Sequence, residues 1–131
     1  SWSALWEVRA MEQGVTLEGL RQEASKRYAD YPVHLDETTW VVLRAPLRLS
    51  TDDRSRLRQL QRSLSDMQDD PQYSDVDLLE TLRNMIRTVA NDRRLADQLI
   101  EAIGEDLALL QTLFEDYSER TQAGEASHSA D

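Results

Sequence analysis

The chain has 131 residues, no cysteine and a formal net charge of −10. Its length is that of one ordinary domain, and the lack of cysteine excludes disulfides, thiolate metal sites and cysteine nucleophiles. The negative charge disfavours general binding of nucleic acid, because it repels phosphates. No apolar run approaches the roughly 18 residues of a membrane span and no signal-peptide pattern is seen, so we expect a cytoplasmic protein.

The first 13 residues predict a short helix that carries two tryptophans. Trp2, Leu5 and Trp6 lie on one side of it, and Gly14 is a typical stop signal. Trp2 and Trp6 are predicted packing anchors. If this end of the chain is exposed, they are also candidates for an interface hot spot, because tryptophan is enriched at such positions.

A second helix is predicted from Thr16 to about Asp30. The Thr16 hydroxyl suits an N-cap, and Pro32 ends the helix because the residue before a proline avoids helical backbone angles. The apolar face consists of Leu17, Leu20, Ala24 and Tyr28.

Residues 33–49 allow two interpretations. Residues 38–43 (TTWVVL) are rich in β-branched and aromatic side chains, which favours a strand. A strand needs a partner for its backbone groups, and the candidates are residues 33–35, residues 47–49 or the same strand of a second subunit. The alternative is a short helix that is capped by Asp36 and stops before Pro46.

A third helix is predicted from Ser50 to about Gln68, with acidic residues in its first turn. Its apolar residues have the strict spacing of a coiled-coil seam; they are Leu57, Leu60, Leu64 and Met67. One flank carries arginines four residues apart, at Arg54, Arg58 and Arg62. The arginines and leucines from 54 to 64 are therefore a candidate interaction surface, together with Trp2 and Trp6.

Two more helices complete the predicted fold. The fourth runs from about Asp75 to Ala90 and has a wide apolar face, so we expect it to be the most deeply buried helix. The last runs from Asp92 to Glu119, about 40 Å if it is unbroken, unless Gly104 splits it in two. Residues 121–131 are small and polar, which predicts a disordered tail behind a single helical domain of residues 1–120.

No pattern of catalytic or ligand-binding residues is found. His34 and His128 lack the spacing of metal ligands, and the four glycines are isolated, so no phosphate loop can form. The acids at 97, 101 and 105 fit a solvated helix face, and those at 66–77 lack the glycine of a calcium loop. We therefore expect no catalytic residue, no metal and no cofactor, and favour a protein that is not an enzyme.

The charge is distributed unevenly along the chain. Residues 44–62 carry six arginines against two aspartates, a balance of +4, whereas residues 95–131 carry nine acids against Arg120, a balance of −8. Arginine suits bidentate pairing with carboxylate or phosphate. The simplest interpretation is that the two segments pair, within one chain or between subunits; the alternative is that the arginines bind phosphate.

These patterns predict a mainly α fold, a bundle of about five helices with a short hairpin or strand near residues 33–49. The leading hypothesis for function is a non-enzymatic protein–protein interaction or regulatory module that self-associates through helical surfaces as a homo-oligomer. The alternative is a transcriptional or nucleic-acid-linked regulator. Such a regulator would contact DNA through the 44–62 arginine patch, or act as an acidic mimic that binds a DNA-binding protein.

Overall fold

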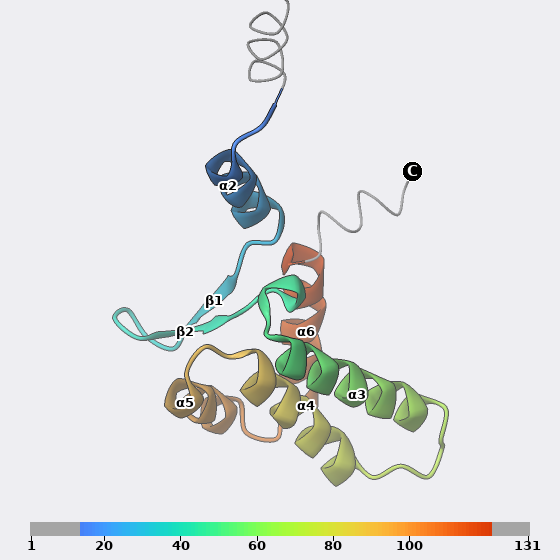
Figure 1. The fold of residues 1–131 in the computed structure, drawn as a ribbon. Coiled ribbons are helices and arrows are strands. Elements are labelled where there is room, and N and C mark those ends of the chain that lie inside the picture. The colour runs from blue at the N-terminus through green and yellow to red at the C-terminus, as the bar shows by residue number, and fades with distance from the viewer. Residues whose placement is uncertain (1–13, 122–131) are drawn as a thin grey trace, which may run out of the picture.

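The computed structural model describes residues 14–121. The predicted helix of residues 1–13, with Trp2 and Trp6, and the predicted tail after residue 121 lie outside this range. The described elements, in chain order, are α2 (Leu17–Arg27), β1 (Tyr31–His34), β2 (Trp40–Leu43), the 3-10 turn η1 (Pro46–Arg48), α3 (Thr51–Gln68), α4 (Asp75–Val89), α5 (Arg93–Ile103) and α6 (Leu107–Thr121) (Figure 1). The mainly helical prediction is confirmed, with five helices and one hairpin in the described part.

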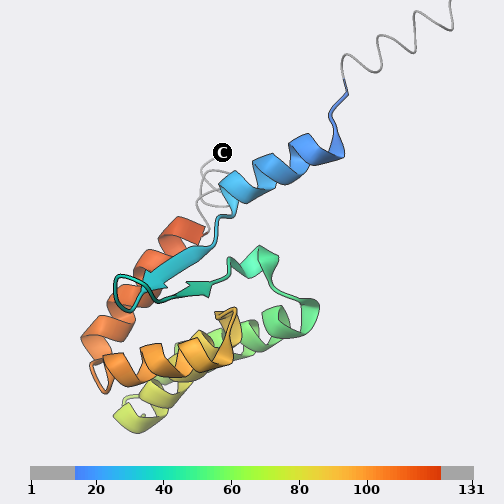
Figure 2. The same cartoon turned by 90° about the vertical axis from the view of Figure 1, so that its left-hand side faces the viewer.

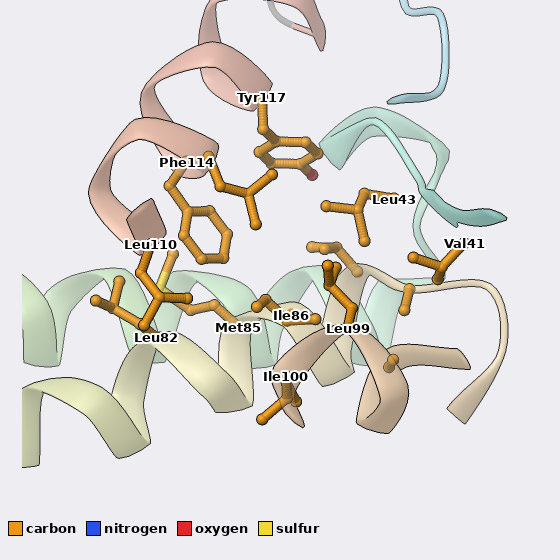
Figure 3. Packing of buried hydrophobic residues seen from close by; sticks show 14 of the residues in the cluster. Val41, Leu43, Leu82, Met85, Ile86, Leu99, Ile100, Leu110, Phe114 and Tyr117 are labelled. Carbon is orange, nitrogen blue, oxygen red and sulfur yellow. The ribbon is translucent and has the colours of Figure 1, made fainter. Parts of the chain in front are cut away.

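Helix α4 is the central element of the fold. It packs against α3 and α5, while β2 contacts α5 and β1 contacts α6 (Figures 1 and 2). Seven of its 15 residues are buried, more than in any other described helix, which confirms the prediction. The core lies where α4 and α5 meet the hairpin and α6; Figure 3 shows Phe114 and Tyr117 of α6 above Met85 and Ile86 of α4, with Leu43 of β2 beside them.

The strand interpretation of residues 38–43 is confirmed in the form of an antiparallel hairpin. Its register pairs Val33 with Val41 and Tyr31 with Leu43. The partner strand is therefore Tyr31–His34, which begins two residues before the predicted segment 33–35. Helix α2 ends at Arg27 rather than near residue 30, which frees the chain for β1. Pro32 lies within β1, where it is tolerated because β1 is an edge strand.

The competing helix interpretation is wrong because Asp36 closes the hairpin turn instead of capping a helix. Its Oδ1 accepts the backbone N–H groups of Thr38 and Thr39, both at 2.8 Å. These hydrogen bonds, with that from Thr38 first, hold the pKa of the Asp36 carboxyl below its usual value. A carboxylate that bonds to backbone donors two and three residues ahead stabilises a turn, not the start of a helix.

The last predicted helix is broken at Gly104, so the interpretation as one unbroken helix is wrong. Gly104 has φ 65° and ψ −132°, a conformation that L side chains rarely adopt. Two residues later, Asp106 starts α6 by accepting the N–H of Leu109 at 3.0 Å. Helix α6 can therefore fold back over the core rather than extend α5 (Figure 2), and it ends at Thr121, inside the predicted tail.

Candidate interaction surfaces

The leucine seam of α3 is used inside the fold. Leu57 is a core residue with 2% of its surface exposed, and Leu60 and Leu64 are partly buried against the core. These side chains lie on the side of α3 that packs against α4. The coiled-coil spacing is therefore explained by the contact of two helices within one chain.

Arg44 belongs to the arginine patch and directly follows β2. It connects this strand with three helices, α3, α4 and α6. Its guanidinium donates from Nε to the carbonyl of Val89 at 3.1 Å, and from Nη2 to those of Thr88 and Ala90 at 3.0 and 3.1 Å. It also lies 3.4 Å from a carboxylate oxygen of Asp53 in α3, and its own backbone carbonyl accepts the Tyr117 hydroxyl of α6 at 2.7 Å. A cation at the C-terminus of α4 satisfies carbonyls that the helix leaves free and complements the helix dipole.

The other arginines of the patch divide into two groups. Arg48 donates to the Ser25 hydroxyl at 2.9 Å, which ties η1 to α2. The remaining four, Arg54, Arg56, Arg58 and Arg62, all lie on α3. Among the ion pairs and side-chain hydrogen bonds found within residues 14–121, none involves these four.

The predicted pairing of these arginines with the acidic part of the chain is therefore not formed within residues 14–121. The acids at 97, 101 and 105 are exposed, as expected for a solvated face. Asp97 pairs instead with Arg87 of α4, at 3.4 Å, and with Arg93 on its own helix, at 3.9 Å. An intersubunit pairing stays a prediction.

Helix α2 is the one α-helix within residues 14–121 with no buried residue. Its start is local, because the Thr16 hydroxyl accepts the N–H of Gly19 at 2.9 Å as predicted. Two of its apolar side chains remain in solvent, since Leu17 and Leu20 are 64% and 52% exposed, and Val15, just before the N-cap, is 75% exposed. Figures 1 and 2 show α2 projecting away from the packed helices α3 to α6.

Strand β1, which follows α2 in the chain, is held against α6 by Tyr31. The Tyr31 hydroxyl of β1 donates to Asp116 at 2.5 Å, and its ring packs edge-on against Tyr117, with centroids 6.0 Å apart. Burial, together with the neighbouring Asp116 carboxylate, raises the pKa of Tyr31 to about 12. Burial also raises the pKa of Tyr117 well above its usual value.

This geometry predicts a specific alkaline loss of stability. A tyrosine whose pKa is raised by folding stabilises the native state fully below its unfolded pKa of about 10, and this stabilisation is lost as the pH rises towards 12. Between about pH 10 and 12, we expect the free energy of unfolding of Tyr31→Phe to fall less than that of the wild-type protein. Urea unfolding at stepped pH measures this decline, and Asp116→Asn should lower the Tyr31 pKa in an absorbance titration.

The remaining candidate groups do not converge. His34 is exposed on β1 and lies beside Trp40, with ring centroids 5.7 Å apart. Within residues 14–121, no three histidine or carboxylate side chains are placed to share a metal ion. None of the helices in this range combines the length and apolar character needed to cross a bilayer.

The described elements thus define a mainly helical domain that holds one helix outside its core. A family model described as mycobacteriophage tail assembly protein matches residues 11–126, which include every described element, and the chain belongs to this family. No curated protein and no solved structure matches it.

Proposed function

We propose that this protein takes part in phage tail assembly as a non-enzymatic protein-binding module that self-associates through α2. Membership of a tail assembly family supports an assembly role that depends on contacts with proteins. The observation that carries the proposal is the exposed apolar face of α2, with Leu17 and Leu20 more than half exposed. Burial of such a face is favourable by about 25 cal/mol per Å² of apolar area.

A second copy of the chain is the partner that this face fits. An apolar stripe is self-complementary, because a two-fold axis places the same leucines opposite one another. The charges beside the stripe have both signs: Arg21 pairs with Glu18, and Arg27 with Glu23, within α2. The α2 of a second copy would therefore not be repelled by a surface that carries charges of only one sign. The family match begins at residue 11, so α2 belongs to the part shared by the family.

Self-association can be tested by sedimentation velocity over a range of protein concentrations. We expect Leu20→Glu to shift the protein towards monomer by about tenfold or more in dissociation constant, because burying an unpaired carboxylate in an apolar contact is costly. Gln22→Glu is the matched control, since it makes the same charge change at an exposed polar position of the same helix.

Two results would contradict this proposal. One is a wild-type protein that stays monomeric at the highest concentration tested. The other is an oligomer that Leu20→Glu and Gln22→Glu weaken equally, which would place the contact elsewhere on the chain. Circular dichroism of both variants shows whether the fold is retained.

A further inference from the structure

We propose that α3 carries a second interaction surface, which binds an acidic helical segment of a different protein. This surface, the arginine ridge, consists of Arg54, Arg58 and Arg62. It is separate from the α2 face, so the inference does not depend on self-association.

The arginine ridge is distinguished by what its residues do not contact. Most arginines of the described chain have an oxygen partner: Arg21, Arg27, Arg87, Arg93 and Arg120 pair with carboxylates, and Arg44, Arg48 and Arg83 bond to carboxylate, hydroxyl or carbonyl oxygens. Within residues 14–121, the arginines that lack such a partner are the four of α3 and Arg94. Unpaired guanidinium groups are thus concentrated on one helix.

The spacing of the arginine ridge matches that of a helix with regularly placed acids. Residues four apart on a helix lie about 6 Å apart along its axis, so the ridge presents three guanidinium groups over about 12 Å. A partner helix with carboxylates four residues apart has the same step. Guanidinium groups bind carboxylates in a bidentate fork, which adds direction to the charge attraction.

The ridge is also accessible. Arg58 and Arg62 are exposed and Arg54 is half-buried, while the apolar seam on a different side of α3 is turned towards α4. None of the exposed large apolar residues of the described chain lies on α3. A partner would therefore be held by charge and hydrogen bonds, which favours fast, salt-sensitive association.

Charge distinguishes an acidic protein segment from the other possible binding partners of the arginine ridge. Duplex DNA carries one charge per about 1.7 Å, and a chain of net charge −10 repels so dense a polyanion more strongly than a short acidic helix. A two-fold contact of ridge with ridge would place arginines against arginines. The exposed acids of a second copy are the remaining competitor, but no helix within residues 14–121 carries three acids four residues apart: Asp97 is already paired with Arg87, and Glu105 lies beyond the end of α5.

The test uses the full chain and a fluorescent synthetic helical peptide with glutamates at three positions four residues apart. Fluorescence anisotropy at low salt measures its affinity. We expect Arg58→Gln/Arg62→Gln to weaken binding by about tenfold, since the variant removes two exposed charge contacts. The matched control, Arg56→Gln/Arg94→Gln, removes two arginines that also lack a partner but lie off the ridge; it should change affinity by less than about twofold.

Several outcomes would overturn the proposal. They are no binding of the glutamate peptide, equal binding of a peptide with glutamine in place of glutamate, and equal losses in the two double variants. Ridge-dependent binding of duplex DNA that is tighter than peptide binding would assign the ridge to nucleic acid. If the ridge variant, and not its control, lowers the sedimentation coefficient of the protein alone, the occupant is a second copy.

Discussion

Replacing Arg44 by alanine should lower the free energy of unfolding by about 3 kcal/mol. Hydrogen bonds to charged groups contribute about 1.5–3 kcal/mol each, and the partial exposure of Arg44 reduces the sum. The variant leaves the carbonyls of Thr88 and Ala90 without their side-chain donor at the point where β2 meets α4, while the Val89 carbonyl keeps the backbone N–H of residue 44 at 2.9 Å. Chemical unfolding followed by circular dichroism measures the change.

Two further variants separate the geometry of Arg44 from its charge. Arg44→Lys keeps the charge but cannot donate in a fork from two nitrogens, so we expect it to recover less than half of the lost stability. Arg56→Ala removes an exposed arginine with no partner within residues 14–121 and should change stability by less than about 0.5 kcal/mol. If Arg44→Ala and Arg56→Ala cost the same, Arg44 does not join the four elements as described.

The parts of the fold that could be predicted from the sequence depend on local interactions. Thr16, Ser50 and Ser74 each accept a backbone N–H three residues ahead, so the starts of α2, α3 and α4 follow from short segments. The strand preference of residues 38–43 is local as well. The break at Gly104 was one of two alternatives, because a glycine permits a positive φ but does not require it.

The parts that could not be predicted depend on which surfaces meet. The spacing of Leu57, Leu60 and Leu64 shows that one side of α3 is apolar, but not that α4 of the same chain covers it. Helix α2 also has apolar residues at helical spacing, but no residue of α2 is buried by any other part of residues 14–121. Arg44 lies in a run of arginines, and only the folded chain shows that it binds carbonyls about 45 residues away. Periodicity identifies a face, whereas its partner is a property of the tertiary structure.

Replacing Leu110 by alanine should lower the free energy of unfolding by about 2–5 kcal/mol, the range for a buried leucine. Leu110 is 1% exposed and lies near Leu82 of α4 in the core (Figure 3). The neighbouring Leu109 is 46% exposed and provides a matched control: the same atoms are deleted one residue away on the same helix. We expect Leu109→Ala to cost less than about 1 kcal/mol, because little buried area is lost.

This pair also tests which side of α6 faces the core. A helix of 3.6 residues per turn rotates by about 100° per residue, so only one of two adjacent leucines can face the core. If both variants lose similar stability, the rotation of α6 about its axis differs from that described. If only Leu110→Ala is destabilising, the rotation of α6 about its axis is as described, with Leu110 turned to the core and Asp116 beside Tyr31. Urea unfolding of the two variants under identical conditions distinguishes these results.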